Sequence, residues 1–283
     1  KAPGSARALE PLQPRGMQFA LGVCSAVHGG ARHVAARLAI DGIERRKIPI
    51  RVGGGASPLD LHVVEVADWS WWEEQSIDES ANPFGAKLWP ASLAVADYLA
   101  GLPEDVLPTM SVLEIGCGNG LPEDVLPTMS VLEIGCGNGL CSLTVAARGA
   151  ASVVASDLSE DALTLTREAA QQQGLAVQTL RFDLADRATP LPPAQLVIAA
   201  DVLYDAGLAT TVAHRVAEAA ARGSWVVVGD QRRAGRQAFE RTLGKLSAPR
   251  LFRFEQSAAV QLAAVGWKKK DVDLMLINPP EGS

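Results

Sequence analysis

The sequence predicts an α/β fold in which a mostly parallel, doubly wound sheet carries helices on both faces. From residue 131 onward, short apolar runs alternate with amphipathic segments, several of which are followed by glycine. This alternation is typical of parallel strands joined by helices that cover the two faces of one sheet. The chain has 283 residues, of which 48% are hydrophobic, so it is long enough to form one large core.

The apolar runs and the segments between them give the order of the elements. We expect strands at residues 131–134, 152–156, 177–182, 196–200 and 225–228. We expect helices at residues 140–148, 159–173, 208–221 and 236–246. The last apolar run, residues 272–277, has no helix after it, so it should enter the sheet antiparallel, with a partner around residues 251–254.

Two smaller regions precede the sheet. Residues 48–52 and 61–66 flank a turn of three glycines, and we expect them to pair as a β-hairpin within a cover formed by residues 48–83. Residues 1–47 are rich in Ala, Arg and Gly and poor in acids. They are interpreted either as a flexible, transit-like extension, which would place the protein in an organelle, or as an ordinary extension of a cytoplasmic protein with a helix around residues 31–45.

A perfect internal duplication lies in front of the sheet. The nineteen residues 102–120 occur again, without one difference, at 121–139. Only the second copy runs directly into an apolar helical segment, whereas the first runs into Leu121 and Pro122. We therefore expect the second copy to form the first strand and residues 102–120 to loop out of the domain at 84–283. Lengthening that connection costs roughly 1 kcal/mol of closure entropy.

The repeated unit ends in a glycine-rich loop, and ligands of open α/β sheets bind where such loops leave the strands. Gly135, Gly137 and Gly139 let a ligand approach the backbone, and Asn138 lies among them. Leu140 stands where the dinucleotide fingerprint needs glycine, which disfavours NAD. Glu133 would repel a pyrophosphate but stabilise a ligand with an amino group and a sulfonium. The loop therefore favours S-adenosylmethionine.

Acidic residues follow the next two strands. Asp157 lies eighteen residues beyond Gly139, and its two oxygens could accept both ribose hydroxyls; alternatively it caps the helix that starts near residue 159. Asp183 could accept from the adenine amino group with Leu184 against the ring, or it could be a plain turn residue. Leu158 and Ala200, which lie at the same edge of the sheet, complete the predicted cofactor-binding set.

The motif from Glu133 to Leu140, with Asp157 ending the next strand, resembles class I S-adenosylmethionine-dependent methyltransferases. The resemblance covers residues 84–277 and implies their Rossmann-like seven-strand sheet with an antiparallel last strand. Residues 85–92 and the run Asp201-Val202-Leu203-Tyr204 resemble the branch with many protein-lysine methyltransferases. That branch implies that Trp89 lies over the cofactor and that Asp201 and Tyr204, in an Asp-x-x-Tyr motif, line the target-lysine pocket.

The expected activity is methyl transfer to a lysine of a protein partner. The alternatives are a small-molecule N-methyltransferase and a silent binding protein impaired by the duplication. A formal charge of −6 and a pI near 5.3 disfavour nucleic acid as a partner, and no run is long enough for a membrane span. Neither the four cysteines nor the four histidines show metal-ligand spacing. Residues 268–270, three lysines, are interpreted as a solvated turn between strands or as a substrate-docking patch.

Overall fold

The computed structural model describes residues 40–54, 57–68, 70–71, 83–104, 106–109, 130–246 and 253–280. Within these ranges a seven-stranded sheet has the order β5-β4-β3-β6-β7-β9-β8. The strands in that order are β5 (Gln178–Arg181), β4 (Ser152–Asp157), β3 (Ser130–Ile134), β6 (Leu196–Ala200), β7 (Trp225–Asp230), β9 (Trp267–Ile277) and β8 (Arg253–Leu262).

The strand directions confirm the predicted doubly wound sheet. Strand β3 pairs in parallel with β4 on one side and with β6 on the other, so the chain winds outward in both directions from β3. Strand β9 lies antiparallel between β7 and β8, as the absence of a following helix predicted. The crevice between the two halves of such a sheet opens at the carboxyl ends of β3 and β6.

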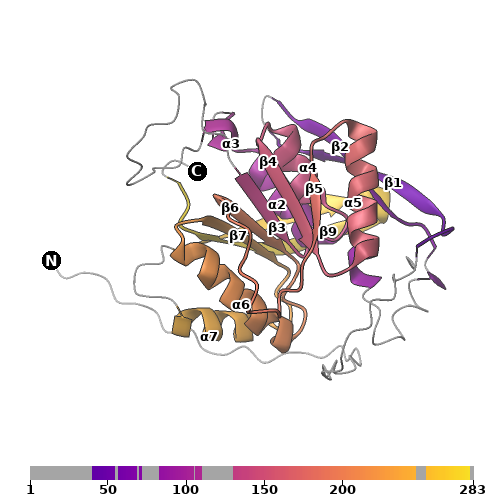
Figure 1. Cartoon of the computed structure of the whole chain (residues 1–283). Coiled ribbons are helices and arrows are strands. Elements are labelled where there is room, and N and C mark those ends of the chain that lie inside the picture. The colour runs from indigo at the N-terminus through magenta and orange to yellow at the C-terminus, as the bar shows by residue number, and fades with distance from the viewer. Residues whose placement is uncertain are drawn as a thin grey trace, which may run out of the picture. The chain divides into compact units, whose positions relative to one another are not determined.

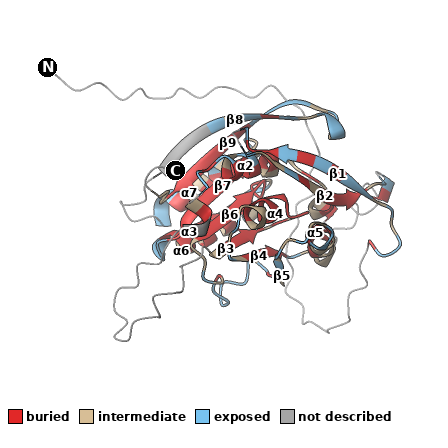
Figure 2. Cartoon of the chain, turned by 90° about the horizontal axis from the view of Figure 1, so that it is seen from above, coloured by how far each residue is buried: buried red, intermediate tan, exposed pale blue. Residues whose placement is uncertain are grey.

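Helices cover both faces of the sheet (Figure 1). One face packs against α2 (Pro90–Ala100), α4 (Leu140–Ala147) and α5 (Glu160–Gln173), and the other against α6 (Ala206–Ala221) and α7 (Arg236–Leu246). Strand side chains alternate between the two cores: Trp225 and Val227 join the first, while Val226 and Val228 join the second. Strands β6 and β7 are therefore buried along their whole length, and β3 is buried except at its first residue (Figure 2).

The N-terminal hairpin is confirmed. Strands β1 (Arg45–Val52) and β2 (Leu59–Val66) pair antiparallel, and their apolar face joins the core that contains α2, α4 and α5. The helix expected around residues 31–45 is wrong at its described end, because Ile40 to Gly42 form a turn and Arg45 already belongs to β1. Residues 1–39, including the rest of the transit-like extension, lie outside the described residues.

The structure uses parts of both copies of the duplication. Strand β3 comes from the second copy, as expected. From the first copy, Leu102 is buried and α3 (Val106–Thr109) places Leu107 in the core, fully buried. We expected residues 102–120 to loop out as one piece, and this is wrong for the first residues of that segment. Burial of their apolar side chains is favourable in free energy, so they pack into the core. Residues 110–129 lie outside the described residues.

The lysines at residues 268–270 lie in the hairpin formed by β8 and β9. The solvated turn predicted for the lysines at 268–270 is wrong: they lie exposed within β9, and the turn is made by η2 (Ala263–Val265) and Gly266. Strand β8 contains residues 253–254 of the expected partner and extends well beyond them, whereas residues 251–252 lie outside the described residues. None of the helices in the described ranges has the length and apolar character that a bilayer crossing requires.

Candidate functional site at the carboxyl ends of the strands

The glycine-rich loop connects β3 to α4 and depends on a left-handed backbone. Gly135 and Gly139 have φ of +66° and +78°. A Cβ on Gly135 would lie 2.6 Å from a methyl group of Val202, and one on Gly139 would lie 2.5 Å from a methyl group of Thr166. Both conformation and space therefore require glycine. Because Gly139 is also the N-cap of α4, the loop leads directly into the N-terminus of that helix.

Asp157 ends β4 and braces this loop. Its Oδ2 accepts a hydrogen bond from the Gly137 amide at 3.0 Å, and its Oδ1 accepts one from the Ser159 amide at 2.9 Å. Burial raises the pKa of the carboxyl group. The N-cap of α5 is Ser159, whose hydroxyl accepts from Ala162, so the alternative that Asp157 caps this helix is wrong. Its contact with ribose hydroxyls stays a prediction.

Glu133 is enclosed beneath the loop. The residue is 1% exposed, and its Oε2 accepts hydrogen bonds from the amide of Ser142 at 2.8 Å and from its hydroxyl at 2.6 Å. Burial outweighs these bonds and raises the pKa of Glu133 to about 7. The carboxyl group thus joins the end of β3 to the first turn of α4, and a contact with a ligand's amino group stays a prediction.

The remaining cofactor candidates lie along the same edge of the sheet. Ala200 is buried at the end of β6, while Leu158, next to Asp157, is 46% exposed. Asp183 is exposed, and its Oδ1 accepts from the Ala185 amide at 2.8 Å, which is the bond expected of a turn residue. Leu184 packs partly against the core beside α6. Contact of either residue with adenine stays a prediction.

Three aromatic side chains from two segments of the chain meet beside the loop. Phe84 belongs to η1 (Pro83–Ala86), Trp89 precedes α2, and Tyr204 follows β6. The ring centroid of Phe84 lies 6.3 Å from that of Trp89 and 5.5 Å from that of Tyr204. The Trp89 indole donates to the Phe84 carbonyl at 2.8 Å. Gly85 packs on the loop, since a Cβ added to it would lie 3.6 Å from the Cα of Gly137.

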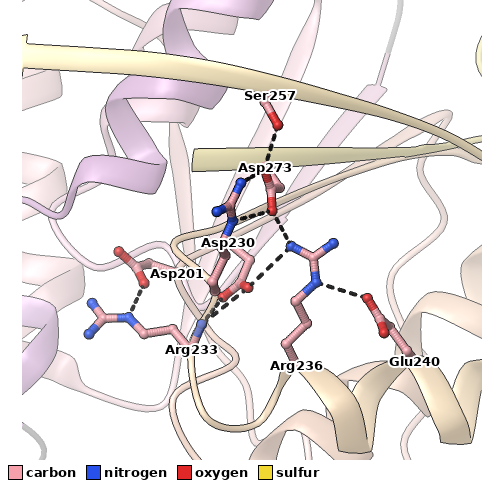
Figure 3. A network of polar contacts seen from close by, with 8 residues as sticks. Asp201, Asp230, Arg233, Arg236, Glu240, Ser257 and Asp273 are labelled. Carbon is pink, nitrogen blue, oxygen red and sulfur yellow. Dashed lines mark hydrogen bonds and ion pairs between the residues drawn. The ribbon is translucent and has the colours of Figure 1, made fainter. Parts of the chain in front are cut away.

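Asp201 lies in the same cluster, in a left-handed conformation with φ of +60°. Its side chain is 3% exposed, and its Oδ1 accepts from Nε of Arg233 at 2.7 Å (Figure 3). The amide group of Gln231 donates to Oδ2. The Arg233 guanidinium carbon lies 5.0 Å from the ring centroid of Trp89. Arg233 therefore links Asp201 to Trp89, and Phe84 links Trp89 to Tyr204. The position of Trp89 over the cofactor stays a prediction.

Sequence reasoning missed Phe84, Gln231 and Arg233. Gln231 and Arg233 follow β7, whose carboxyl end lies next to that of β6 in the sheet. The available signal was the presence of polar residues directly after the fifth parallel strand, because the carboxyl ends of parallel strands share one edge of the sheet.

A network of ion pairs fixes the loop between β7 and α7 (Figure 3). The Asp230 carboxylate, which is fully buried, accepts from the Arg233 amide at 3.2 Å. Asp273 of β9 accepts from Arg232 at 3.0 Å and from Arg236 at 2.5 Å. The hydrogen bond from Arg232 is the first cause that lowers the pKa of Asp273 to about 2.

The chemistry of these residues fits S-adenosylmethionine. Nδ2 of Asn138, in the glycine loop, is buried and has no hydrogen-bond partner within the described ranges. Leu158 gives an exposed apolar surface beside the carboxylate of Asp157, as a ligand with a flat base and a polar ribose requires. The part of the chain that the structure describes contains no group of three His, Cys, Asp or Glu residues placed to hold a metal ion.

A family of known proteins matches the sequence of this chain. A family model described as lysine methyltransferase matches residues 73–245, more than half of the chain. No curated protein sequence matches.

Similar solved structures include a putative RNA methyltransferase from Pyrococcus horikoshii, with 13% identity over 53% of this chain and 74% of that chain and a TM-score of 0.42. TrmN from Thermus thermophilus has 25% identity over 53% of this chain and 44% of its own, with a TM-score of 0.41. Magnesium protoporphyrin IX methyltransferase from Synechocystis PCC 6803, with bound SAH, has 16% identity over 54% and 75%, with a TM-score of 0.40.

Proposed function

The chain belongs to the lysine methyltransferase family, and we propose that it methylates the side-chain amine of a lysine in a protein substrate. Its cofactor is S-adenosylmethionine. The observation that supports a lysine acceptor is the meeting of Asp201, Tyr204 and Trp89 beside the glycine loop. A desolvated carboxylate and an indole face that can contact the same cation form a combination that binds alkylammonium groups.

The glycine loop and the cluster have different tasks. The loop, with Asp157 and Asn138, would hold the cofactor, whose sulfonium supplies an electrophilic methyl group. The cluster would hold the acceptor. Gly85 packs on Gly137, and the Gly135 backbone meets Val202, the residue after Asp201, so the two parts touch at both ends. Placing two reactants side by side in this way is the main contribution an enzyme makes to a displacement reaction.

The acceptor must lose a proton before it can attack. A free lysine has a pKa of about 10.4, so its neutral form costs on the order of 4 to 5 kcal/mol at neutral pH. Contact with the rings of Phe84, Trp89 and Tyr204 would remove part of the water around the amine, and this desolvation would lower its pKa. Asp201 would attract the ammonium as it arrives and align its nitrogen, while the rings favour its deprotonated form.

The substitution D201N tests this role. Asparagine tolerates the left-handed backbone of this position and keeps the size of the side chain, but it removes the charge. We expect methyl transfer from radiolabelled S-adenosylmethionine to lysate proteins to fall at least ten-fold, with calorimetric affinity for S-adenosylhomocysteine unchanged. D205N is the matched control, since asparagine also caps α6 well at this exposed position. Unchanged turnover in D201N would contradict the assignment.

The same assay separates the other functions that the sequence allowed. Label in the metabolite fraction, with none in protein, would indicate a small-molecule N-methyltransferase. Failure to bind S-adenosylhomocysteine until residues 102–120 are deleted would indicate a protein silenced by its duplication.

A further inference from the structure

The two groups suited to bind a substrate ammonium already hold a cation of the chain itself. Arg233 donates from Nε to the Asp201 carboxylate at 2.7 Å, and its guanidinium lies over the Trp89 ring at 5.0 Å from the centroid. An ion pair with a carboxylate and a position over an indole face are the two interactions that would bind a lysine ammonium. The arginine and an incoming lysine therefore need the same partners.

The loop that carries Arg233 is fixed while the side chain is accessible. The Arg233 amide is bound to the buried Asp230 carboxylate, and Arg232 and Arg236 on either side are bound to Asp273 (Figure 3). The Arg233 side chain itself is 31% exposed, against 3% for Asp201. The guanidinium can therefore leave the carboxylate by rotations of its own side chain, without movement of the loop.

Arg215 shows what a purely structural arginine looks like in this fold. Its side chain is 1% exposed, and its nitrogens donate to the carbonyls of Leu184, Thr189 and Asp186 and to the Glu218 carboxylate. Those partners come from a neighbouring loop and from its own helix, and they enclose the guanidinium. Arg233 instead approaches its ring and its carboxylate from a partly exposed position.

Backbone strain marks the same place. Asp201 and Arg232 are non-glycine residues with φ of +60° and +61°. Such conformations cost of order 1 kcal/mol or more and concentrate at binding and switch sites. Asp201 carries the carboxylate itself, and Arg232 directly precedes Arg233 in the loop.

We propose that Arg233 is an internal occupant of the acceptor site, which a primary ammonium of the substrate must displace from Asp201 and Trp89. The inference rests on the proposed function, because it takes these two residues as the acceptor site. Displacement makes Arg233 a specificity-determining residue: only a cation that reaches both partners from solvent binds, and the site is filled by the chain's own guanidinium when no acceptor is present.

Binding of n-butylammonium, a minimal lysine side chain, tests the displacement without any cofactor. The full chain is labelled with ¹⁵N, and the Trp89 indole resonance is assigned with W89F. We expect R233M, which keeps much of the apolar stem but removes the competing charge, to bind n-butylammonium about ten-fold tighter than the unmodified chain. R241M, an identical change at an exposed position of α7, should bind as the unmodified chain does.

A second measurement needs no variant. In the unmodified chain, saturation with n-butylammonium should move the Arg233 Nε–H resonance to the position of solvent-exposed arginines. An unchanged affinity in R233M, or an unmoved Arg233 resonance while n-butylammonium is bound, would overturn the proposal. Failure of the unmodified chain to bind S-adenosylhomocysteine would count against the proposed function instead, and the two failures are therefore distinguishable.

Discussion

The protein should become less stable as the pH rises, and replacing Glu133 by glutamine should reduce this fall in stability. The carboxyl group is buried beneath the glycine loop, and its pKa rises from 4.5 to about 7. In the folded state it therefore keeps its proton at a pH where the unfolded chain has released it. Because the folded state then binds more protons, the free energy of unfolding falls as the pH rises from about 4.5 through about 7.

The size of the effect follows from the shift. The difference between 4.5 and about 7, at 1.36 kcal/mol for each pKa unit, corresponds to about 3 kcal/mol of stability lost once the pH is well above 7. The Ser142 bonds at 2.8 and 2.6 Å are already included, since they oppose the effect of burial. Glutamine cannot ionise, so E133Q should show a flatter dependence, even if its amide lowers stability by a constant amount at every pH.

The assay is urea unfolding at several values between about pH 5 and about pH 8, at constant ionic strength. Asp230 also has a pKa raised by burial, and it contributes equally to both proteins. Asp157, whose charge helps to raise the pKa of Glu133, cancels only in part. E104Q, at an exposed position, should retain the slope of the unmodified chain. Parallel pH profiles for the unmodified chain and E133Q would refute the argument that burial dominates at this carboxyl group.

G139A should lower stability by about 1 to 3 kcal/mol and abolish S-adenosylhomocysteine binding, because the added Cβ would clash with Thr166. The control G244A, whose Cβ would have no neighbour within 4 Å on α7, should raise stability by up to about 1 kcal/mol. Thermal unfolding measures the stability of both variants, and calorimetry measures their binding. Asp273 has a lowered pKa, so its ion pairs stabilise the fold fully above about pH 4 and are lost as the pH falls through about 2. D273N should lower stability by about 1 to 2 kcal/mol at neutral pH and by much less near pH 2, as measured in urea titrations. Deleting residues 102–120 leaves one intact copy of the repeat, so the shortened chain should still form β3, bind S-adenosylhomocysteine at least as well and gain about 1 kcal/mol of stability. A shortened chain that unfolds more readily would show that the additional copy contributes contacts.

Expectations from sequence succeeded where one local signal decided the outcome. Apolar runs located every central strand, and the spacing of the three glycines identified a loop that needs a left-handed backbone. They failed at the lysines 268–270. A run of charged residues is typical of a turn, and only the pairing of β9 with β8 shows that these lysines belong to a long antiparallel strand. They also failed at Leu107, whose burial depends on how the first copy of the repeat is used.

The sequence by itself determined the sheet, the glycine loop and the acidic residues at the strand ends. Each of these depends on a short stretch of chain, through its hydrophobic periodicity or its need for a particular backbone conformation. Only the tertiary structure decided which side chains meet. Phe84, Trp89, Asp201, Tyr204 and Arg233 come from three segments of the chain, and the sheet order places β6 beside β7. Pairing between distant segments is set by packing of the whole domain, and no local pattern encodes that an arginine after β7 would occupy the carboxylate after β6.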